Sequence, residues 1–265
     1  MQIQSLLHGA HLCLVESDLD EKTRLSFLTS RLWDEGLTFL NNEEVFRHLE
    51  PGRPARPILV NPDNLASRGT GSRQGRIAMM HAIAHIEFNA INLAWDAIYR
   101  FRGLPIEYYS DWIKVADDET RHFLMVRNYL KERGHDYGDF DAHDGLWHMA
   151  ERTSHDPLVR MALVPRVLEA RGLDVTPQMI EKFLQANDID AAKILETIYT
   201  EEIEHVKTGS RWFSYLCNER QLPEQDTFAK LFKEYVGRSI RGKLNYQARL
   251  SAGFTESELR MLNSI

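Results

Sequence analysis

Carboxylate and imidazole side chains recur in this sequence at a spacing that suits a metal ion. Glu119 is followed three residues later by His122, and Glu202 is followed three residues later by His205. Because residues i and i+3 lie on the same face of a helix, each pair can direct one carboxylate and one imidazole toward a common point. Carboxylate oxygen and imidazole nitrogen are donors that suit both iron and manganese.

A further glutamate precedes each pair at nearly the same distance. Glu87 stands 32 residues before Glu119, and Glu169 stands 33 residues before Glu202. This distance corresponds to one helix, a turn and a helix running back, so each glutamate is predicted to lie level with the pair that follows it. Four carboxylates and two imidazoles would then converge between four helices, and their four negative charges would offset two divalent cations.

The predicted helix faces around these residues are otherwise apolar. The stripe that contains Glu87 carries Met80, Ile83, Ala84, Ala90, Ile91 and Ala94. The faces of the two Glu-x-x-His motifs carry Trp112, Val115, Ala116, Phe123 and Val126 in the first, and Leu195, Ile198, Val206 and Phe213 in the second. Burying carboxylates without partners is costly, and a bound metal is the simplest compensation.

A single Glu-x-x-His motif would be weak evidence in a chain with 11 histidines. Glu132 and His135 have the same spacing, but they flank a glycine that is expected to end a helix, and Arg100 stands 32 residues before Glu132. His81 and His85 lie one turn apart, yet His85 is about 200° around the helix from the ligand glutamate, so we interpret both as structural. The repetition of the complete pattern is what favours a metal site.

Three more polar residues adjoin the predicted ligands. Asp118 and Glu201 each directly precede a ligand glutamate. A metal-bound histidine commonly donates its second N–H to a carboxylate, so either acid is a candidate to orient such a histidine, the alternative being an exposed helix acid. Tyr199 lies one turn before Glu202, where a core role is expected more often than a redox role.

Helical periodicity runs from about residue 72 to residue 216 and predicts four main helices. They are expected at residues 73–102, 106–133, 157–171 and 188–217, with a short helix at 177–186 and breaks at Gly103, Pro105 and Gly134. Asp156 and Pro157 supply an N-cap and a first helical residue, and Gly172 is expected to end the third helix. Pro165, four residues before Glu169, removes a backbone hydrogen bond and should kink that helix, which would open a coordination position or a substrate channel, or have no effect.

The segments before and after these helices are predicted from their patterns. Residues 3–50 read as two or three amphipathic helices, and residues 51–62 as an extended Pro-rich strap that Ile58, Leu59 and Val60 anchor on the domain surface. No segment alternates as a strand does, so the predicted fold is all-α. We expect N-terminal helices and the strap at 1–72, a four-helix bundle at 73–217 and a C-terminal helical tail at 218–265.

Composition narrows the class of protein. The chain has 265 residues, of which 43% are hydrophobic, enough for a sizeable core. Its two cysteines exclude a disulfide framework, a zinc ribbon and a rubredoxin-like iron site. The net charge of −7 disfavours a nucleic-acid partner, and we interpret a basic stretch, Arg238, Arg241, Lys243 and Arg249, as solvated surface. The lack of a signal-peptide pattern and of a membrane-spanning apolar run predicts a cytoplasmic protein.

The segment Asp118-Glu-Thr-Arg-His122 resembles the DExRH signature of bacterial di-iron monooxygenases in the ferritin-like superfamily. More closely, most of the chain is similar to a bacterial ferritin-like family catalogued as domain of unknown function 455, with the likeness carried by residues 85–97, 117–123, 164–177, 201–206 and 211–217. This resemblance implies a ferritin-like four-helix bundle in which Glu119 and Glu202 bridge two metals while Glu87 and Glu169 are terminal ligands. Pro165 and Arg166 depart from the usual third helix, so Glu169 rests mainly on symmetry and resemblance.

The resemblance implies two bound iron ions, or manganese, and an O₂-dependent oxidoreductase acting on an unknown small substrate. Iron oxidation and storage, or peroxide removal, is an alternative that the long terminal segments suit poorly. A tRNA-modifying di-iron hydroxylase is a narrower variant that the acidic charge disfavours. A metal-stabilised interaction domain without catalysis is the alternative from a different class. The substrate, the electron donor, the choice of metal and the oligomeric state, a homodimer included, stay open.

Overall fold

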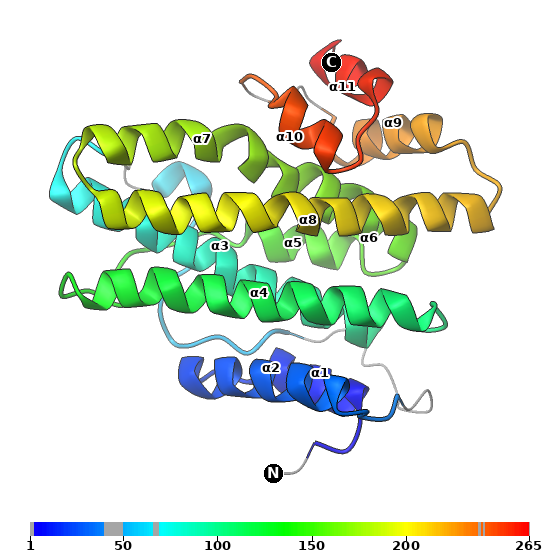
Figure 1. Cartoon of the computed structure of the whole chain (residues 1–265), viewed down its shortest axis with the longest axis horizontal. Coiled ribbons are helices and arrows are strands. Elements are labelled where there is room, and N and C mark those ends of the chain that lie inside the picture. The colour runs from blue at the N-terminus through cyan, green and yellow to red at the C-terminus, as the bar shows by residue number, and fades with distance from the viewer. Residues whose placement is uncertain (1–2, 40–49, 66–68, 238–239, 241, 265) are drawn as a thin grey trace. The chain divides into compact units, whose positions relative to one another are not determined.

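The computed structural model of the chain describes residues 3–39, 50–65, 69–237, 240 and 242–264, and helices dominate these ranges (Figure 1). No strand occurs within them, so the all-α prediction is confirmed. None of the helices in these ranges is both long and apolar enough to cross a membrane. The chain divides into two compact units, Met1–Trp147 and His148–Ile265, with α5 (Gly145–Arg152) at the boundary. The predicted three-part division at residues 72 and 217 stays a prediction.

The first unit is built on a hairpin of α3 (Arg73–Arg100) and α4 (Ile106–Lys131). Ser72 caps α3 by accepting a hydrogen bond from the backbone N–H of Gly75. Gly103 makes the turn with a positive φ of 74°, a conformation that glycine adopts without strain. Both helices were predicted with ends within two residues of those observed.

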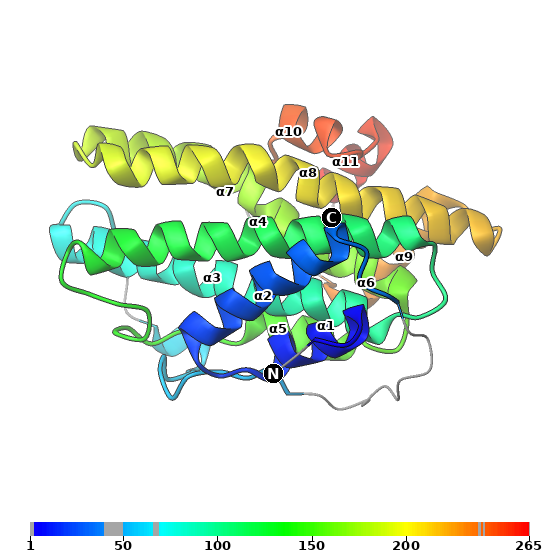
Figure 2. The same ribbon diagram turned by 60° about the horizontal axis from the view of Figure 1, so that its bottom comes forward.

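Two N-terminal helices cover this hairpin. α1 (Leu6–Val15) packs on α3, and α2 (Leu19–Asp34) packs on α4 (Figure 2). These are two of the helices expected between residues 3 and 50, and a third would lie in residues 40–49, outside the described residues.

The Pro-rich strap is extended, as predicted, but different residues hold it. Ile58 and Leu59 were predicted to be apolar anchors, and this is wrong because their side chains are 51% and 37% exposed. The backbone anchors the strap instead: the N–H of Val60 donates to the carbonyl of Ala142 at 2.8 Å, and the N–H of Ala142 donates to the carbonyl of Ile58 at 3.0 Å. Arg53 adds a bidentate ion pair with Asp144. A short helix, η1 (Pro62–Asn64), follows the strap.

The second unit is built on a long broken helix that runs beside α8 (Ile189–Glu219). The broken helix comprises α6 (Pro157–Leu163), a π-helical segment η2 (Val164–Glu169) and α7 (Ala170–Gln185). Asp156 caps α6 through the N–H of Leu158, as predicted. The irregularity expected at Pro165 takes the form of the π-helical segment.

The prediction that Gly172 ends the third helix is wrong, and so is the separate short helix at 177–186. α7 continues through Gly172 and contains Pro177. Pro177 has no N–H for the carbonyl of Leu173, four residues earlier. That carbonyl accepts a hydrogen bond from the side-chain amide of Asn245 at 3.1 Å instead, so the helix keeps its acceptor satisfied and continues.

Three short helices follow α8: α9 (Glu224–Tyr235), α10 (Tyr246–Ser251) and α11 (Glu256–Ser264). The C-terminal helical tail is thus confirmed. Lys243 is exposed as expected, whereas Arg249 is fully buried against Asp174, so the interpretation of Arg249 as solvated surface is wrong. Arg238 and Arg241 lie outside the described residues.

Lys22 joins three helices of the first unit at one buried point. Its ammonium group donates to the carbonyls of Cys13 and Leu14, near the negative end of the α1 dipole, at 2.6 and 3.2 Å. It also donates to Oδ1 of Asn92 on α3 at 2.7 Å. Burial lowers the pKa of Lys22 to about 7, so the contact that fixes α1 and α2 on α3 titrates near neutrality.

A Lys22→Met variant tests this junction. The unfolded chain holds the lysine proton up to about pH 10.5, whereas the folded protein releases it near pH 7. Raising the pH between these values therefore favours the folded state, which binds fewer protons, by up to about 1.4 kcal/mol per pH unit. The free energy of unfolding in urea of the wild type, minus that of Lys22→Met, should rise by about 2 kcal/mol from pH 7 to pH 9. A difference that stays flat contradicts the low pKa.

Candidate metal centre

α3 and α4 place three of the predicted ligands together. Glu87 on α3 and Glu119 and His122 on α4 each offer one ligand atom, and these atoms lie within 4.8 Å of one another. Nδ1 of His122 is 3.3 Å from Oε2 of Glu87 and 3.5 Å from Oε2 of Glu119. The three side chains are at most 6% exposed. We call these residues the α3–α4 cluster.

The charges of the α3–α4 cluster depend on one another. Burial raises the pKa of Glu87, and the negative charge of Glu119 raises it further. Burial alone would lower the pKa of His122, but hydrogen bonds to Glu119 and Glu87 and their negative charges outweigh it and raise that pKa above its usual value. Two carboxylate oxygens and one imidazole nitrogen in a buried position fit iron or manganese, because a cation offsets the repulsion that otherwise retains protons here.

Three buried aromatic residues pack together around the hairpin. Phe88 and Phe123 directly follow Glu87 and His122 in the sequence, and their ring centroids are 5.7 Å apart. Tyr137 packs on both rings, with its centroid 5.2 Å from Phe88 and 5.3 Å from Phe123. These contacts join α3, α4 and the loop after α4.

His81 and His85 hold the loop after α4, which agrees with their structural interpretation. Nε2 of His85 is 3.0 Å from the carbonyl of His143, and its Nδ1 is 2.8 Å from the hydroxyl of Tyr137. Burial lowers the pKa of His85 to about 4, so the ring is neutral: Nε2 donates to the carbonyl and Nδ1 accepts from Tyr137. Nε2 of His81 accepts from the N–H of Gly138 at 2.8 Å.

The second Glu-x-x-His motif lies on α8. Nδ1 of His205 is 3.1 Å from Oε2 of Glu202, and the two side chains are 3% and 13% exposed. The sequence spacing therefore places this pair on one face as it does on α4. By contrast, His135 of the unrelated Glu132 motif pairs with Asp139 at 2.9 Å.

One close contact and one ordinary contact define the register between α8 and the broken helix. A Cβ atom at Gly209 would lie 2.3 Å from the ring of Pro165, so helix and ring touch there. A Cβ atom at Gly172 would lie 3.9 Å from Cγ of Glu202. Glu169 stands four residues after Pro165, and His205 stands four residues before Gly209, so this antiparallel register sets Glu169 level with His205. Glu169 is half-buried at the end of η2, and its role as a ligand stays a prediction.

The three neighbours of the predicted ligands have different surroundings. Asp118 pairs with Arg121 on its own helix. The hydroxyl of Tyr199 accepts a hydrogen bond from the side-chain amide of Asn245 at 2.9 Å, and the tyrosine is half-buried. Glu201 is half-buried beside a surface hollow. Their predicted roles of orienting a ligand histidine or taking part in redox chemistry stay predictions.

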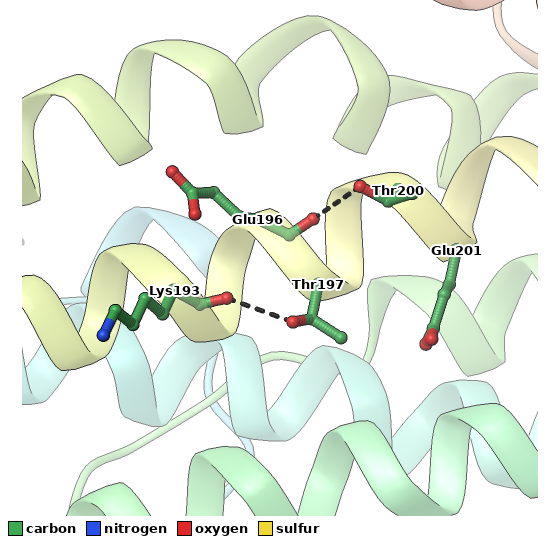
Figure 3. A pocket seen from close by; sticks show the side chains of 5 residues that line it. All are labelled: Lys193, Glu196, Thr197, Thr200 and Glu201. Atoms are coloured by element: carbon green, nitrogen blue, oxygen red, sulfur yellow. Dashed lines mark hydrogen bonds between the residues drawn. The ribbon is translucent and has the colours of Figure 1, made fainter.

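This hollow has a volume of about 540 Å³. It is lined by five residues along one stripe of α8, which Figure 3 shows: Lys193, Glu196, Thr197, Thr200 and Glu201. The two threonine hydroxyls donate to the carbonyls of Lys193 and Glu196, at 3.2 and 2.8 Å. The charged side chains are therefore what the hollow offers to a ligand. Sequence reasoning singled out Glu201 alone, although spacings of three and four residues mark all five as one helix face.

The matches to known proteins cover the segments that carry the predicted ligands. The family model described as "Protein of unknown function (DUF455)" matches residues 15–260, which include all six predicted ligands. A relative from Haemophilus influenzae, described as an uncharacterized protein, is 46% identical over 213 residues, which cover 78% of this chain and 74% of the relative. No solved structure matches the chain significantly. The resemblance to this family is thereby confirmed.

The contact of Gly209 with Pro165 can be tested by two matched glycine variants. A methyl group at Gly209 would overlap the Pro165 ring, so Gly209→Ala must push α8 away from η2 and should cost about 1–3 kcal/mol of unfolding free energy. Gly172→Ala meets only an ordinary contact and should be neutral or stabilise α7 by up to about 1 kcal/mol. Equal unfolding free energies of the two variants in urea would show that the close contact does not set the register.

Proposed function

We propose that the chain, which belongs to the family described as protein of unknown function (DUF455), is a di-metal carboxylate protein. Two iron or manganese ions would be held in a ferritin-like four-helix bundle by Glu87, Glu119, His122, Glu169, Glu202 and His205. The proposed activity is the O₂-dependent oxidation of a small organic substrate, by an oxidase or oxygenase reaction.

The α3–α4 cluster is the observation that carries this proposal. Two carboxylates and one imidazole with ligand atoms within 4.8 Å of one another are buried on otherwise apolar helix faces. A merely structural arrangement would be cheaper with apolar side chains, because buried ion pairs often contribute less than well-packed apolar residues of the same volume. A metal site explains why donors, and not aliphatic side chains, occupy these positions.

The residues of the chain would hold charge and exclude water. Bound metal ions would supply redox and Lewis-acid chemistry. Glu87 and Glu119 would balance their positive charge, and His122 would complete the donor set on α4. The three side chains are buried, which strengthens every electrostatic interaction in the cluster.

The open hollow on the surface of α8 is a place where a small polar substrate is proposed to bind. One of its lining residues, Glu201, directly precedes the proposed ligand Glu202 in the sequence. Lys193, Glu196 and Glu201 give it both signs of charge, which suits a polar substrate.

Metal counting tests the proposal. Protein loaded anaerobically with Fe(II) should retain about two metals per chain, and exposure to O₂ should change its optical spectrum. Glu119→Ala and Glu202→Ala should each lose metal while keeping their helical circular dichroism. Glu132→Ala is the matched control, because Glu132 belongs to a motif of the same spacing but its side chain is 72% exposed, and it should retain both metals.

The outcome also separates the alternatives. Fewer than one metal per wild-type chain, or an equal loss in Glu132→Ala, would refute the di-metal site. Growth of large iron-filled particles after O₂ exposure would favour iron storage. Two bound metals without any spectral response to O₂ would favour a metal-stabilised interaction domain.

A further inference from the structure

A buried arginine lies on the π-helical segment, one turn before Glu169. Arg166 is 2% exposed, and its guanidinium carbon lies over the rings of three phenylalanines. The distances to the ring centroids are 4.7 Å for Phe213 on α8, 4.3 Å for Phe228 on α9 and 4.6 Å for Phe254 before α11. The aromatic faces stabilise the cation, but they offer no strong acceptor for its N–H groups.

The acceptors come from α8 and from the C-terminal tail. Nη2 of Arg166 donates to Oε1 of Glu258 at 2.8 Å, and Nε donates to Oγ of Ser210 at 3.2 Å. Glu258 is itself buried, and its other carboxylate oxygen accepts from the N–H of Thr255 at 2.8 Å. The N–H of Glu258 donates back to the Thr255 hydroxyl at 3.2 Å, so Glu258 closes a capping box that starts α11. One carboxylate thus joins the start of α11 to η2.

A second buried ion pair ties the tail to the other side of Glu169. Arg249 of α10 donates through Nε and Nη2 to the two carboxylate oxygens of Asp174, at 2.9 and 2.8 Å. Its Nη2 also donates to the carbonyl of Ala170 at 3.2 Å. Both partners of this pair are fully buried. The tail therefore holds the broken helix three residues before Glu169, and again one and five residues after it.

We propose that Glu258 and Arg249 of the C-terminal tail position Glu169 as a metal ligand by clamping the π-helical segment through Arg166, Ala170 and Asp174. This inference rests on the proposed di-metal function. The first tie lies within η2, the one stretch of the broken helix that departs from α-helical geometry, and the second tie begins at the residue directly after it. If Glu258 is removed, the buried charge of Arg166 has lost its carboxylate, and η2 must move for Arg166 to regain one or to reach water. Glu169 ends η2 and moves with it. Arg166 is a positioning residue in this scheme and binds no metal.

Metal titration of three tail variants tests the clamp. Glu258→Ala removes the partner of Arg166, and Glu258→Gln keeps an oxygen acceptor for Arg166 and for the cap. Thr255→Ala is the matched control, because it weakens the same capping box at an exposed position and leaves the Arg166 to Glu258 contact in place. Full-length proteins are titrated with Co(II), whose absorption spectrum reports coordination, and their folding is checked by circular dichroism.

Glu258→Ala should weaken the binding of one of two Co(II) ions about 10- to 100-fold and shift the absorption spectrum. Glu258→Gln keeps an acceptor for Arg166 but lacks the negative charge, so it should weaken binding and shift the spectrum less than Glu258→Ala does. Thr255→Ala should match the wild type. Should Glu258→Ala not fold, a spectrum of Glu258→Gln that differs from the wild type still supports the clamp, and an identical one counts against it. Wild-type affinity and spectrum in a folded Glu258→Ala, or an equal loss in Thr255→Ala, would overturn the clamp alone. A wild-type protein that binds less than one Co(II) would overturn the proposed function and the clamp with it.

Discussion

The mutual repulsion of buried carboxylates is the constraint on which the candidate centre depends. Glu87 and Glu119 are both buried and face the same imidazole, and burial together with the negative charge of Glu119 raises the pKa of Glu87. An α-helix satisfies its own backbone hydrogen bonds, which leaves side-chain charge as the quantity still to be balanced. The hairpin of α3 and α4 therefore brings the three donors to one level. A cation is the partner that this balance requires.

Two other buried charges of the chain, those of Lys22 and Arg249, have different surroundings from the α3–α4 cluster. Lys22 donates to three oxygens, and Arg249 makes two hydrogen bonds with Asp174 and one with the carbonyl of Ala170. Each of these buried cations faces oxygen acceptors, and the contacts tie helices together. The α3–α4 cluster differs because its two carboxylates converge on His122 at 3.3 and 3.5 Å. Convergence of like charges, more than burial, marks a site built for a cation.

Local spacing predicted the parts of the centre that local geometry controls. Residues three positions apart on a helix lie on the same face, so the side chains of Glu202 and His205 lie together as expected. The missing N–H of Pro165 also coincides with an irregular helical segment, as expected. The end of the third helix could not be found this way, because the acceptor that Pro177 leaves is satisfied by Asn245, far along the chain. The same holds for Arg249, whose position in a basic stretch suggested solvent and whose partner Asp174 was not visible from that stretch.

Glu87 and Glu169, the two glutamates that precede the Glu-x-x-His motifs, lie on helices of different geometry. Glu87 lies within an uninterrupted α-helix, whose continuous hydrogen bonds fix the direction of the side chain. Glu169 lies where π-helical geometry gives way to α-helical geometry, four residues after the proline that touches Gly209 of α8 and between two ties to the tail. A junction between two helix types rearranges at lower cost than the middle of a continuous helix, since fewer backbone hydrogen bonds must change. In the proposed centre, the position of Glu169 would therefore depend on the ties to the tail, whereas the position of Glu87 depends on its own continuous helix.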